Sequence, residues 1–368
     1  MRLNPAHGLR YGTEIRGVGN VRSRVVVTIA VVALGLLLAG GASSTADEAK
    51  KYYSQGVQQA SQGKYEEAAE SLRKAIEIRP KFPEAYHLLG IVYTNGQRRL
   101  SDAADAFKKA IELNPSFAEA FYNLALVYQV QGKPVEAEQE LKKALAIHPK
   151  YEEALFALAQ LYERQQASGS AVAAYAQLLA LRPDHQEALY ALGYLYESQG
   201  RSQEAKDLLT RLVKLRPDHA DAHYLLGTMA EKANNLAEAE QAYKKAIAAR
   251  PDFVDAHYNL GFLLKSKGEL EPAAQEFNTT VKLKPDYADA YMNLGVVYAL
   301  QHKFSEAEQA YEEAIRLRPT MAEAYYNLGV FYEFHMRDTT RALVTYKKYL
   351  ALGGTDERVQ RIVREVKQ

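Results

Sequence analysis

The chain has 368 residues, with 46 lysine and arginine residues against 45 aspartate and glutamate residues and a formal net charge of +1. It contains no cysteine, which excludes disulfides, thiolate metal sites and a catalytic thiol. Residues 1–46 carry five arginines and one glutamate, so the remainder has a net charge of −3 and offers no basic surface that would attract nucleic acid.

The first 48 residues have the order of a targeting or anchoring segment. A basic leader (residues 1–24) precedes the uncharged apolar run VVVTIAVVALGLLLAGGA (residues 25–42), and a short linker (residues 43–48) follows. This order is typical of a secretory signal, with cleavage after Ala42 or Ala46. Eighteen apolar residues are also just enough for an uncleaved transmembrane anchor, and a buried core helix is disfavoured because the run has no polar face.

Both membrane alternatives place the arginines on the cytoplasmic side and the rest of the chain on the far side. In a bacterium we therefore expect a protein of the cell envelope. It would be anchored in the inner membrane and face the periplasm, or be released into the periplasm if the signal is cleaved.

From residue 49 the sequence repeats a unit of two predicted helices. In the copy Ala288–Met321, apolar residues within Tyr291–Tyr298 recur at spacings of three and four, which predicts the first helix. Ser305 and Glu308 have the spacing of a capping box and predict the start of the second. Pro319 predicts its end, because proline lacks the backbone donor.

Three columns, meaning the same position in successive repeats, hold this register along the chain. A proline closes eight units, at intervals of 35 residues once and 34 residues afterwards: Pro80, Pro115, Pro149, Pro183, Pro217, Pro251, Pro285 and Pro319. The first helix carries a glycine or alanine: Gly56, Gly90, Ala125, Ala159, Gly193, Gly227, Gly261, Gly295 and Gly329. The second helix carries an alanine: Ala68, Ala103, Ala137, Ala171, Ala205, Ala239, Ala273, Ala307 and Ala342. Small residues at both positions would let the two helices of a unit approach closely.

This pattern resembles the tetratricopeptide repeat (TPR) family, with its 34-residue period, small-residue columns and closing proline. The resemblance implies an all-α fold, a TPR α-solenoid in which about nine repeats (residues 49–352) form a right-handed superhelix. Residues 353–368 are then expected to form a C-terminal capping helix. Thr355 would begin that helix, with Val359, Ile362, Val363 and Val366 on its apolar face.

The resemblance also implies a binding surface, because first helices in this family line a concave groove that receives extended peptides. The residues expected there are Tyr122, Asn123, Tyr190, Tyr224, Tyr258, Asn259, Asn293, Tyr326 and Asn327. An asparagine side chain both donates and accepts hydrogen bonds, so successive asparagines could hold a peptide backbone. The alternative is that these tyrosines and asparagines serve only helix packing.

No catalytic constellation stands out, and we expect no enzyme activity, cofactor or metal. His219 and His223 have a spacing that suits metal ligands, but both occupy positions that repeat elsewhere in the array, which favours packing or a solvated loop.

These observations favour a scaffold or adaptor of the cell envelope that binds an extended peptide or a partner helix in its groove. The alternative is a structural assembly or spacer component of an envelope complex, such as a pilus, secretion, polysaccharide-export or outer-membrane assembly system. That component would act through its convex face or by self-association. The partner is a protein in both cases, and the oligomeric state stays open.

Overall fold

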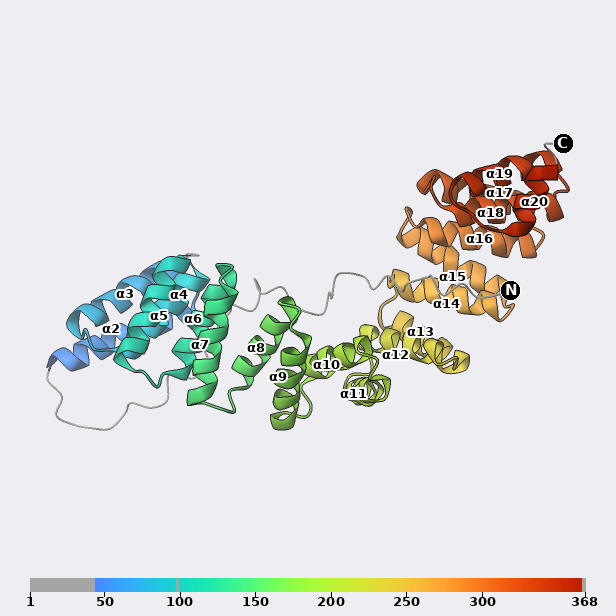
Figure 1. The fold of residues 1–368 in the computed structure, drawn as a ribbon. Helices are drawn as coiled ribbons and strands as arrows, with labels where there is room; N and C mark the ends of the chain where they lie inside the picture. Colours follow the sequence, from blue (N-terminus) through green and yellow to red (C-terminus); the bar gives the residue numbers. More distant parts are fainter. Residues whose placement is uncertain (1–43, 97–98, 366–368) are drawn as a thin grey trace. The chain divides into compact units, whose positions relative to one another are not determined.

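The computed structural model describes residues 44–96 and 99–365, and every regular element in these ranges is a helix (Figure 1). The basic leader and the apolar run therefore lie outside the described residues. Residues 44–48, expected to be a linker, form the start of the first described helix. None of the helices within the described ranges is long and apolar enough to cross a membrane.

The described helices follow the chain as nine successive helix–turn–helix repeats, called hairpins here, and a final helix. Their bounds are α2 (Ser44–Ser61) with α3 (Tyr65–Ile78), α4 (Pro83–Asn95) with α5 (Leu100–Leu113), α6 (Ala118–Val130) with α7 (Pro134–Ile147), α8 (Glu152–Arg164) with α9 (Ser168–Leu181), α10 (Gln186–Ser198) with α11 (Ser202–Leu215), α12 (Ala220–Lys232) with α13 (Leu236–Ala249), α14 (Val254–Ser266) with α15 (Leu270–Leu283), α16 (Ala288–Leu300) with α17 (Phe304–Leu317), and α18 (Ala322–Val330) with the π-helical turn η1 (Phe331–His335) and α19 (Thr339–Ala351). The final helix is α20 (Glu357–Glu365). This is the expected all-α TPR solenoid.

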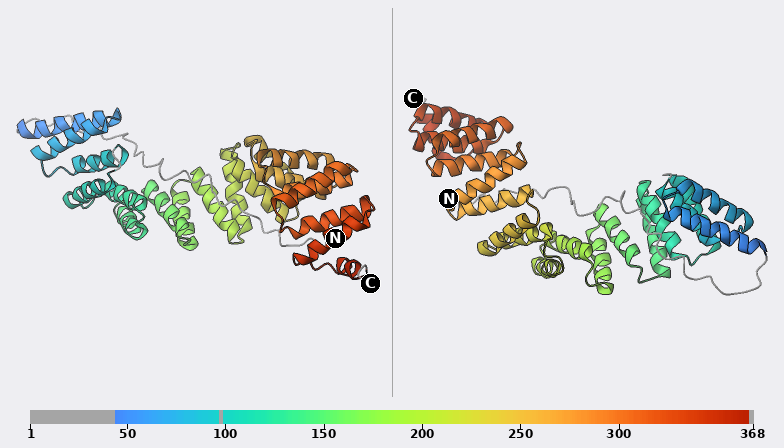
Figure 2. Two further views of the ribbon diagram at one scale, coloured as in Figure 1. Left: turned by 90° about the horizontal axis from the view of Figure 1, so that it is seen from above. Right: turned by 180° about the vertical axis from the view of Figure 1, so that it is seen from behind.

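The small first-helix column makes room for a large ring from the second helix. A Cβ atom added to Gly295 would lie 2.6 Å from the ring of Tyr311, and Gly227 stands in the same relation to Tyr243. Ala239 and Ala307 are fully buried between the paired helices. Small residues were expected to let the two helices approach closely, and the structure shows that these glycines accommodate an aromatic side chain. The succession of helices along the chain can be followed by colour in Figure 2.

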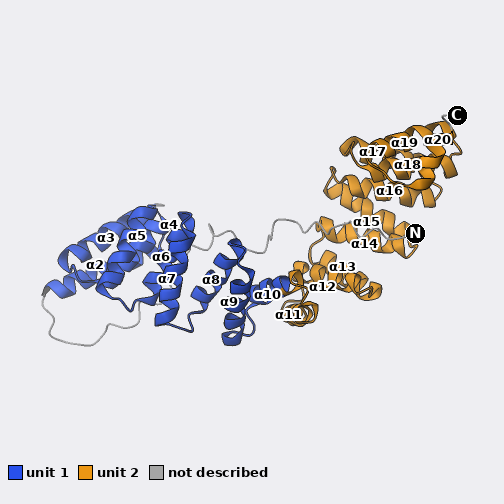
Figure 3. Ribbon diagram, in the orientation of Figure 1, with its two compact units in different colours: residues 1–195 blue, residues 196–368 orange. Residues whose placement is uncertain are grey.

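The chain divides into two compact units, residues 1–195 and residues 196–368, with the boundary inside α10 (Figure 3). In each unit the second helix of one hairpin packs on the first helix of the next, as α5 does on α6 and α15 on α16. First helices also contact each other directly, α14 with α16 and α16 with α18. An apolar stripe that no hairpin could bury alone is thereby covered by its neighbours.

The second helices begin without the expected capping box. In α17 the residue before the helix is Lys303, which makes no side-chain capping bond, and Ser305 already lies inside the helix. The helical hydrogen bonds start at Lys303, whose carbonyl accepts from Ala307 N at 3.0 Å. The preceding turn holds His302 at φ 60°, a position occupied in other turns by glycine, such as Gly268 at φ 80°. The prediction from Ser305 and Glu308 was wrong because this turn brings the chain into the helix two residues earlier.

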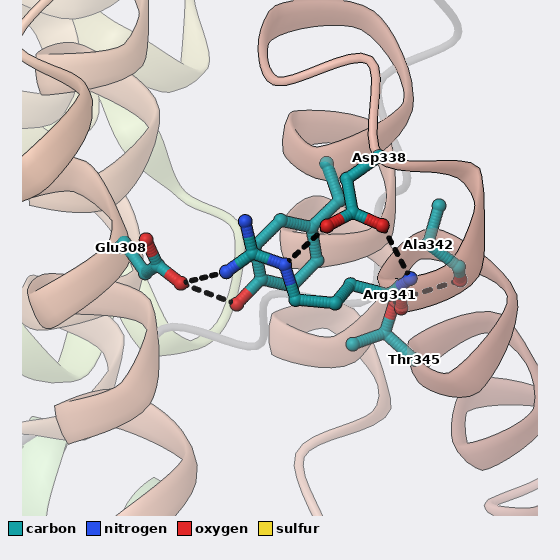
Figure 4. A network of polar contacts seen from close by, with 6 residues as sticks. Glu308, Asp338, Arg341, Ala342 and Thr345 are labelled. Atoms are coloured by element: carbon teal, nitrogen blue, oxygen red, sulfur yellow. Dashed lines mark hydrogen bonds and ion pairs between the residues drawn. The ribbon is translucent and has the colours of Figure 1, made fainter.

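The ninth hairpin absorbs one extra residue. Gly329 and Ala342 are 13 residues apart, whereas Gly295 and Ala307 are 12 apart, and the added residue is taken up by the π-helical turn η1. Polar contacts then fix the start of α19 (Figure 4). Asp338 accepts a hydrogen bond from Arg341 N at 2.9 Å, and the Arg341 guanidinium reaches Glu308 of α17 at 2.6 Å.

The helix α20 closes the solenoid as expected, with Val359 and Val363 buried against the ninth hairpin, and Val366 lies outside the described residues. Its capping residue differs from the expectation. Asp356 accepts a hydrogen bond from Val359 N at 2.9 Å, so it takes the role assigned to Thr355.

Candidate functional site

The predicted tyrosines lie at one repeating position of the first helices and are half-buried. Most pack on an aromatic ring that precedes the next first helix. The centroid distances are 5.2 Å for Tyr122–Tyr151, 4.9 Å for Tyr224–Phe253, 4.9 Å for Tyr258–Tyr287 and 5.3 Å for Tyr326–Tyr349, where Tyr349 lies on α19. Tyr190 holds the same position on α10 and is also half-buried. One side of each packed ring is therefore covered by the neighbouring aromatic ring, and only the rest of the tyrosine side chain is accessible to a partner.

The predicted asparagines bond to the hairpin before their own. Their Nδ2 atoms lie 3.1 Å from Tyr224 Oη for Asn259, 3.2 Å from Tyr258 Oη for Asn293, 3.1 Å from Met292 Sδ for Asn327 and 2.8 Å from His87 Nε2 for Asn123. Asn293 and Asn123 are 2% and 4% exposed. The two columns thus hold successive first helices together. Recognition of a peptide by these residues stays a prediction.

Another column, near the end of each first helix, was missed by the sequence reasoning. Glu163, Glu231 and Glu333 accept hydrogen bonds from the buried hydroxyls of Tyr175, Tyr243 and Tyr346 at 2.8, 2.6 and 2.5 Å. In the fifth hairpin Leu209 stands at the tyrosine position and has no hydroxyl, and Glu197 instead forms an ion pair with Lys232 at 2.6 Å. The signal was present in the sequence, because a glutamate 12 or 13 residues before a tyrosine recurs in three repeats.

A recurring ion pair links the two ends of a hairpin. An acid in the first turn of the first helix pairs with the arginine that precedes the closing proline, as in Asp221–Arg250 and Asp289–Arg318, the latter with two bonds of 3.1 and 2.6 Å. Such a bidentate contact is the strongest geometry for this pair of groups.

Helix α14 departs from both patterns. At its start the side-chain carboxylate of Asp255 forms no hydrogen bond or ion pair with any described residue, and Lys284 occupies the place of the arginine. At its end Lys265 stands where the preceding hairpin has Glu231, and Phe277 takes the place of Tyr243. We call the surface formed by Asp255, Tyr258, Phe262 and Lys265 the α14 face; all four side chains are partly exposed.

Lys265 is a cation without a carboxylate. Its Nζ donates to Asn293 Oδ1 at 2.5 Å and lies 4.4 Å from the centroid of the Phe262 ring, whereas no carboxylate of the described residues comes within 4.0 Å. Burial lowers the pKa of Lys265 to about 8, so the ammonium form still predominates at neutral pH. Burial likewise raises the pKa of Asp255, and only the charge of Lys284 opposes this.

The two histidines with metal-like spacing have local partners. His219 Nδ1 accepts from Ala222 N at 3.2 Å at the start of α12, and His223 Nε2 donates to the Pro217 carbonyl at 2.9 Å. The described residues contain no group of three potential metal ligands.

Several solved structures show similarity to parts of this chain. YrrB, described as a TPR protein with an unusual peptide-binding site, is 25% identical, covering 50% of this chain and 95% of that chain with a TM-score of 0.45. A MamA structure from Desulfovibrio magneticus RS-1 is 26% identical, with coverages of 46% and 96% and a TM-score of 0.43. PilF of Pseudomonas aeruginosa is 22% identical, with coverages of 60% and 97% and a TM-score of 0.48. A comparison with curated proteins returned no match.

Family models account for most of the helical array. Models described as tetratricopeptide repeat match residues 95–152, 156–205, 198–253, 242–275 and 288–321. A model described as TPR repeat matches residues 58–96 and 263–302. The chain therefore belongs to the tetratricopeptide repeat family of protein-interaction scaffolds.

Proposed function

We propose that this protein holds a segment of a partner protein, extended or helical, against its first helices and performs no chemistry on it. The observation that carries the proposal is an apolar surface at matching positions of adjacent helices. Leu300 on α16 and Phe334 on η1 are 49% and 61% exposed. Val296 and Val330, one turn earlier on α16 and α18, are half-buried. Apolar side chains repeated at one position in neighbouring repeats form a continuous contact surface, unlike isolated exposed residues.

The tyrosines suit the same role. Each ring is held in place by its packing on a neighbouring aromatic, so little conformational entropy is lost when a partner binds. A partner would gain apolar contact with the exposed part of a ring. The hydroxyls of Tyr224 and Tyr258 are already engaged by asparagines.

Site-specific photo-crosslinking distinguishes this proposal from the structural alternative. A photoreactive amino acid at Leu300 or Phe334 of the full-length protein is expected to give a discrete adduct with a partner in intact cells. The matched control is Val344, which is 64% exposed but lies on the second helix α19. Adducts from Val344 alone, or adducts only between two copies of this chain, would support an assembly or spacer component and contradict binding at the first helices.

We further propose that the apolar run (residues 25–42) directs the repeats across a membrane, into the periplasm of a bacterial host. A protease added to whole cells is then expected to cut the repeats only after the outer barrier is opened. Intact-mass analysis separates the two alternatives, because a cleaved signal gives an N-terminus near Ser43 or Asp47 and an anchor retains residues 1–42. Cleavage of the repeats only after lysis of the cytoplasm would disprove this topology.

A further inference from the structure

We propose that the α14 face binds a partner segment carrying one basic and one acidic side chain about four to five residues apart, with an apolar side chain between them. This inference rests on the proposed function, because it specifies the chemistry of a segment that the first helices bind. Three observations carry it: the spacing of the four residues, the unsatisfied charge at each end, and the aromatic rings between the charges.

The four residues of the α14 face share one side of the helix. Their spacings of three, four and three residues keep them in line, and the ten residues from Asp255 to Lys265 correspond to about 15 Å along the axis. An extended chain advances about 3.3 Å per residue, so four to five residues of a partner cover that distance.

The carboxylate at the start of α14 lacks the intramolecular ion pair that its counterparts in the two adjacent hairpins form. Asp221 on α12 and Asp289 on α16 each form an ion pair with an arginine of their own hairpin. In the hairpin of α14 the corresponding residue is Lys284, whose Nζ lies 5.1 Å from the centroid of the Tyr287 ring and more than 4.0 Å from the carboxylate oxygens of Asp255. A basic side chain of a partner could occupy the place that arginine takes in the neighbouring hairpins.

The ammonium group of Lys265, at the end of α14, has no negatively charged partner among the described residues. At the same position α12 has Glu231, which accepts a hydrogen bond from Tyr243, and α16 has the uncharged Ala299. Lys265 has only the neutral amide of Asn293 and the face of Phe262. A partly buried charge without a counter-charge destabilises the folded protein, and an acidic side chain or terminal carboxylate of a partner would remove that cost.

The residues between the two charges select for an apolar group. Phe262 is half-buried beneath the ammonium of Lys265, and Tyr258 is packed on Tyr287 with its hydroxyl bonded to Asn293. Phe262 has no hydrogen-bonding group, and the Tyr258 hydroxyl already accepts one bond from Asn293. The order along α14 is therefore anion, two rings, cation, which complements a segment with the order cation, apolar, anion.

A displayed library of random nonapeptides, selected on the immobilised full-length protein, tests this chemistry directly. The enriched peptides are expected to pair a lysine or arginine with an aspartate or glutamate four to five positions away, in either order along the peptide. Asp255→Asn should abolish the preference for a basic residue, and Lys265→Met the preference for an acidic one. Each variant should weaken binding of the best peptide by about five- to tenfold.

Three further variants make the test specific. Lys284→Arg is expected to pair with Asp255 as Arg318 pairs with Asp289, and thereby to raise the unfolding midpoint while lowering peptide affinity as much as Asp255→Asn does. Asp252→Asn and Lys282→Met remove exposed charges of the same hairpin outside the α14 face, and should leave affinity within about twofold of the wild type.

The outcomes separate this inference from the function on which it rests. Peptides enriched without charge preference, and bound equally by Asp255→Asn and Lys265→Met, would leave a peptide-binding scaffold and overturn the inference. Wild-type peptide affinity in Lys284→Arg would overturn the role of Asp255. No enrichment of any peptide on the wild type would count against peptide binding at the first helices as a whole.

Discussion

Replacing Tyr243 with alanine is expected to lower the free energy of unfolding by about 4 kcal/mol, because the ring is fully buried between α12 and α13. The ring lies directly against Gly227, which has no side chain to fill the space that the substitution would leave. The variant also removes the hydrogen bond from Tyr243 Oη to Glu231. Urea unfolding followed by circular dichroism measures the loss. Hydrogen exchange should place it in α11–α14, which are the hairpin of Tyr243 and the helices on either side that contact it.

The control for this prediction is Tyr243→Phe, which keeps the ring and removes only the hydroxyl. Phenylalanine fits at this position, because Phe277 occupies it in the next hairpin with the same relation to Gly261. The expected cost is about 1.5 to 3 kcal/mol, the value of a hydrogen bond to a charged group. If Tyr243→Ala and Tyr243→Phe were equally destabilised, the ring would not be the main contribution, and our account of the glycine column would be incorrect.

The repeating hairpins were predictable because their determinants are local. Spacings of three and four, a small residue in each helix and a closing proline act within one 34-residue unit, and the structure confirms the hairpins they predict. Where a repeat departs from this pattern, its local sequence did not predict the conformation of the turn. One extra residue lies between Gly329 and Ala342, and the structure accommodates it in a π-helical turn, where Phe331 and Tyr332 stay buried.

The candidate site was predictable only as a position on the first helices. Its partners depend on contacts between hairpins, such as that of Asn259 with Tyr224, 35 residues earlier. No pattern within one repeat reveals such a contact. The α14 face had a visible signal, since Lys284 replaces an arginine and Phe277 replaces a tyrosine. The meaning of these changes became clear only when the structure showed which charges the usual residues satisfy.

Acidification is expected to destabilise the first unit through His87. This histidine occupies the tyrosine position of α4, packed on Phe117 with a centroid distance of 4.6 Å, and its Nε2 lies 2.8 Å from Asn123 Nδ2. Burial lowers the pKa of His87 to about 4, although a hydrogen bond with the backbone of Glu119 opposes the shift. The ordinary pKa of about 6.5 applies in the unfolded chain, so the unfolded state takes up the proton first as the pH falls. The stability that the neutral ring provides is therefore complete above about pH 6.5 and is lost as the pH falls towards 4, by about 2 to 3 kcal/mol at pH 4.5.

His87→Tyr isolates this contribution from all other titrating groups. Tyrosine stands at the same position in Tyr53, Tyr122 and Tyr224, and its hydroxyl can accept from Asn123 as Tyr224 accepts from Asn259. The variant keeps the ring and the acceptor but binds no proton between pH 4 and 7. Urea unfolding of both proteins at pH 7.5 and pH 4.5, with hydrogen exchange read from α4 to α7, should show the wild type losing about 2 to 3 kcal/mol more than the variant. An equal loss in both proteins would mean that His87 is protonated in the folded state without cost. In that case the contact between His87 Nε2 and Asn123 would have to change so that Nε2 can carry a proton. The packing of α4 on α6 would then not depend on a neutral histidine.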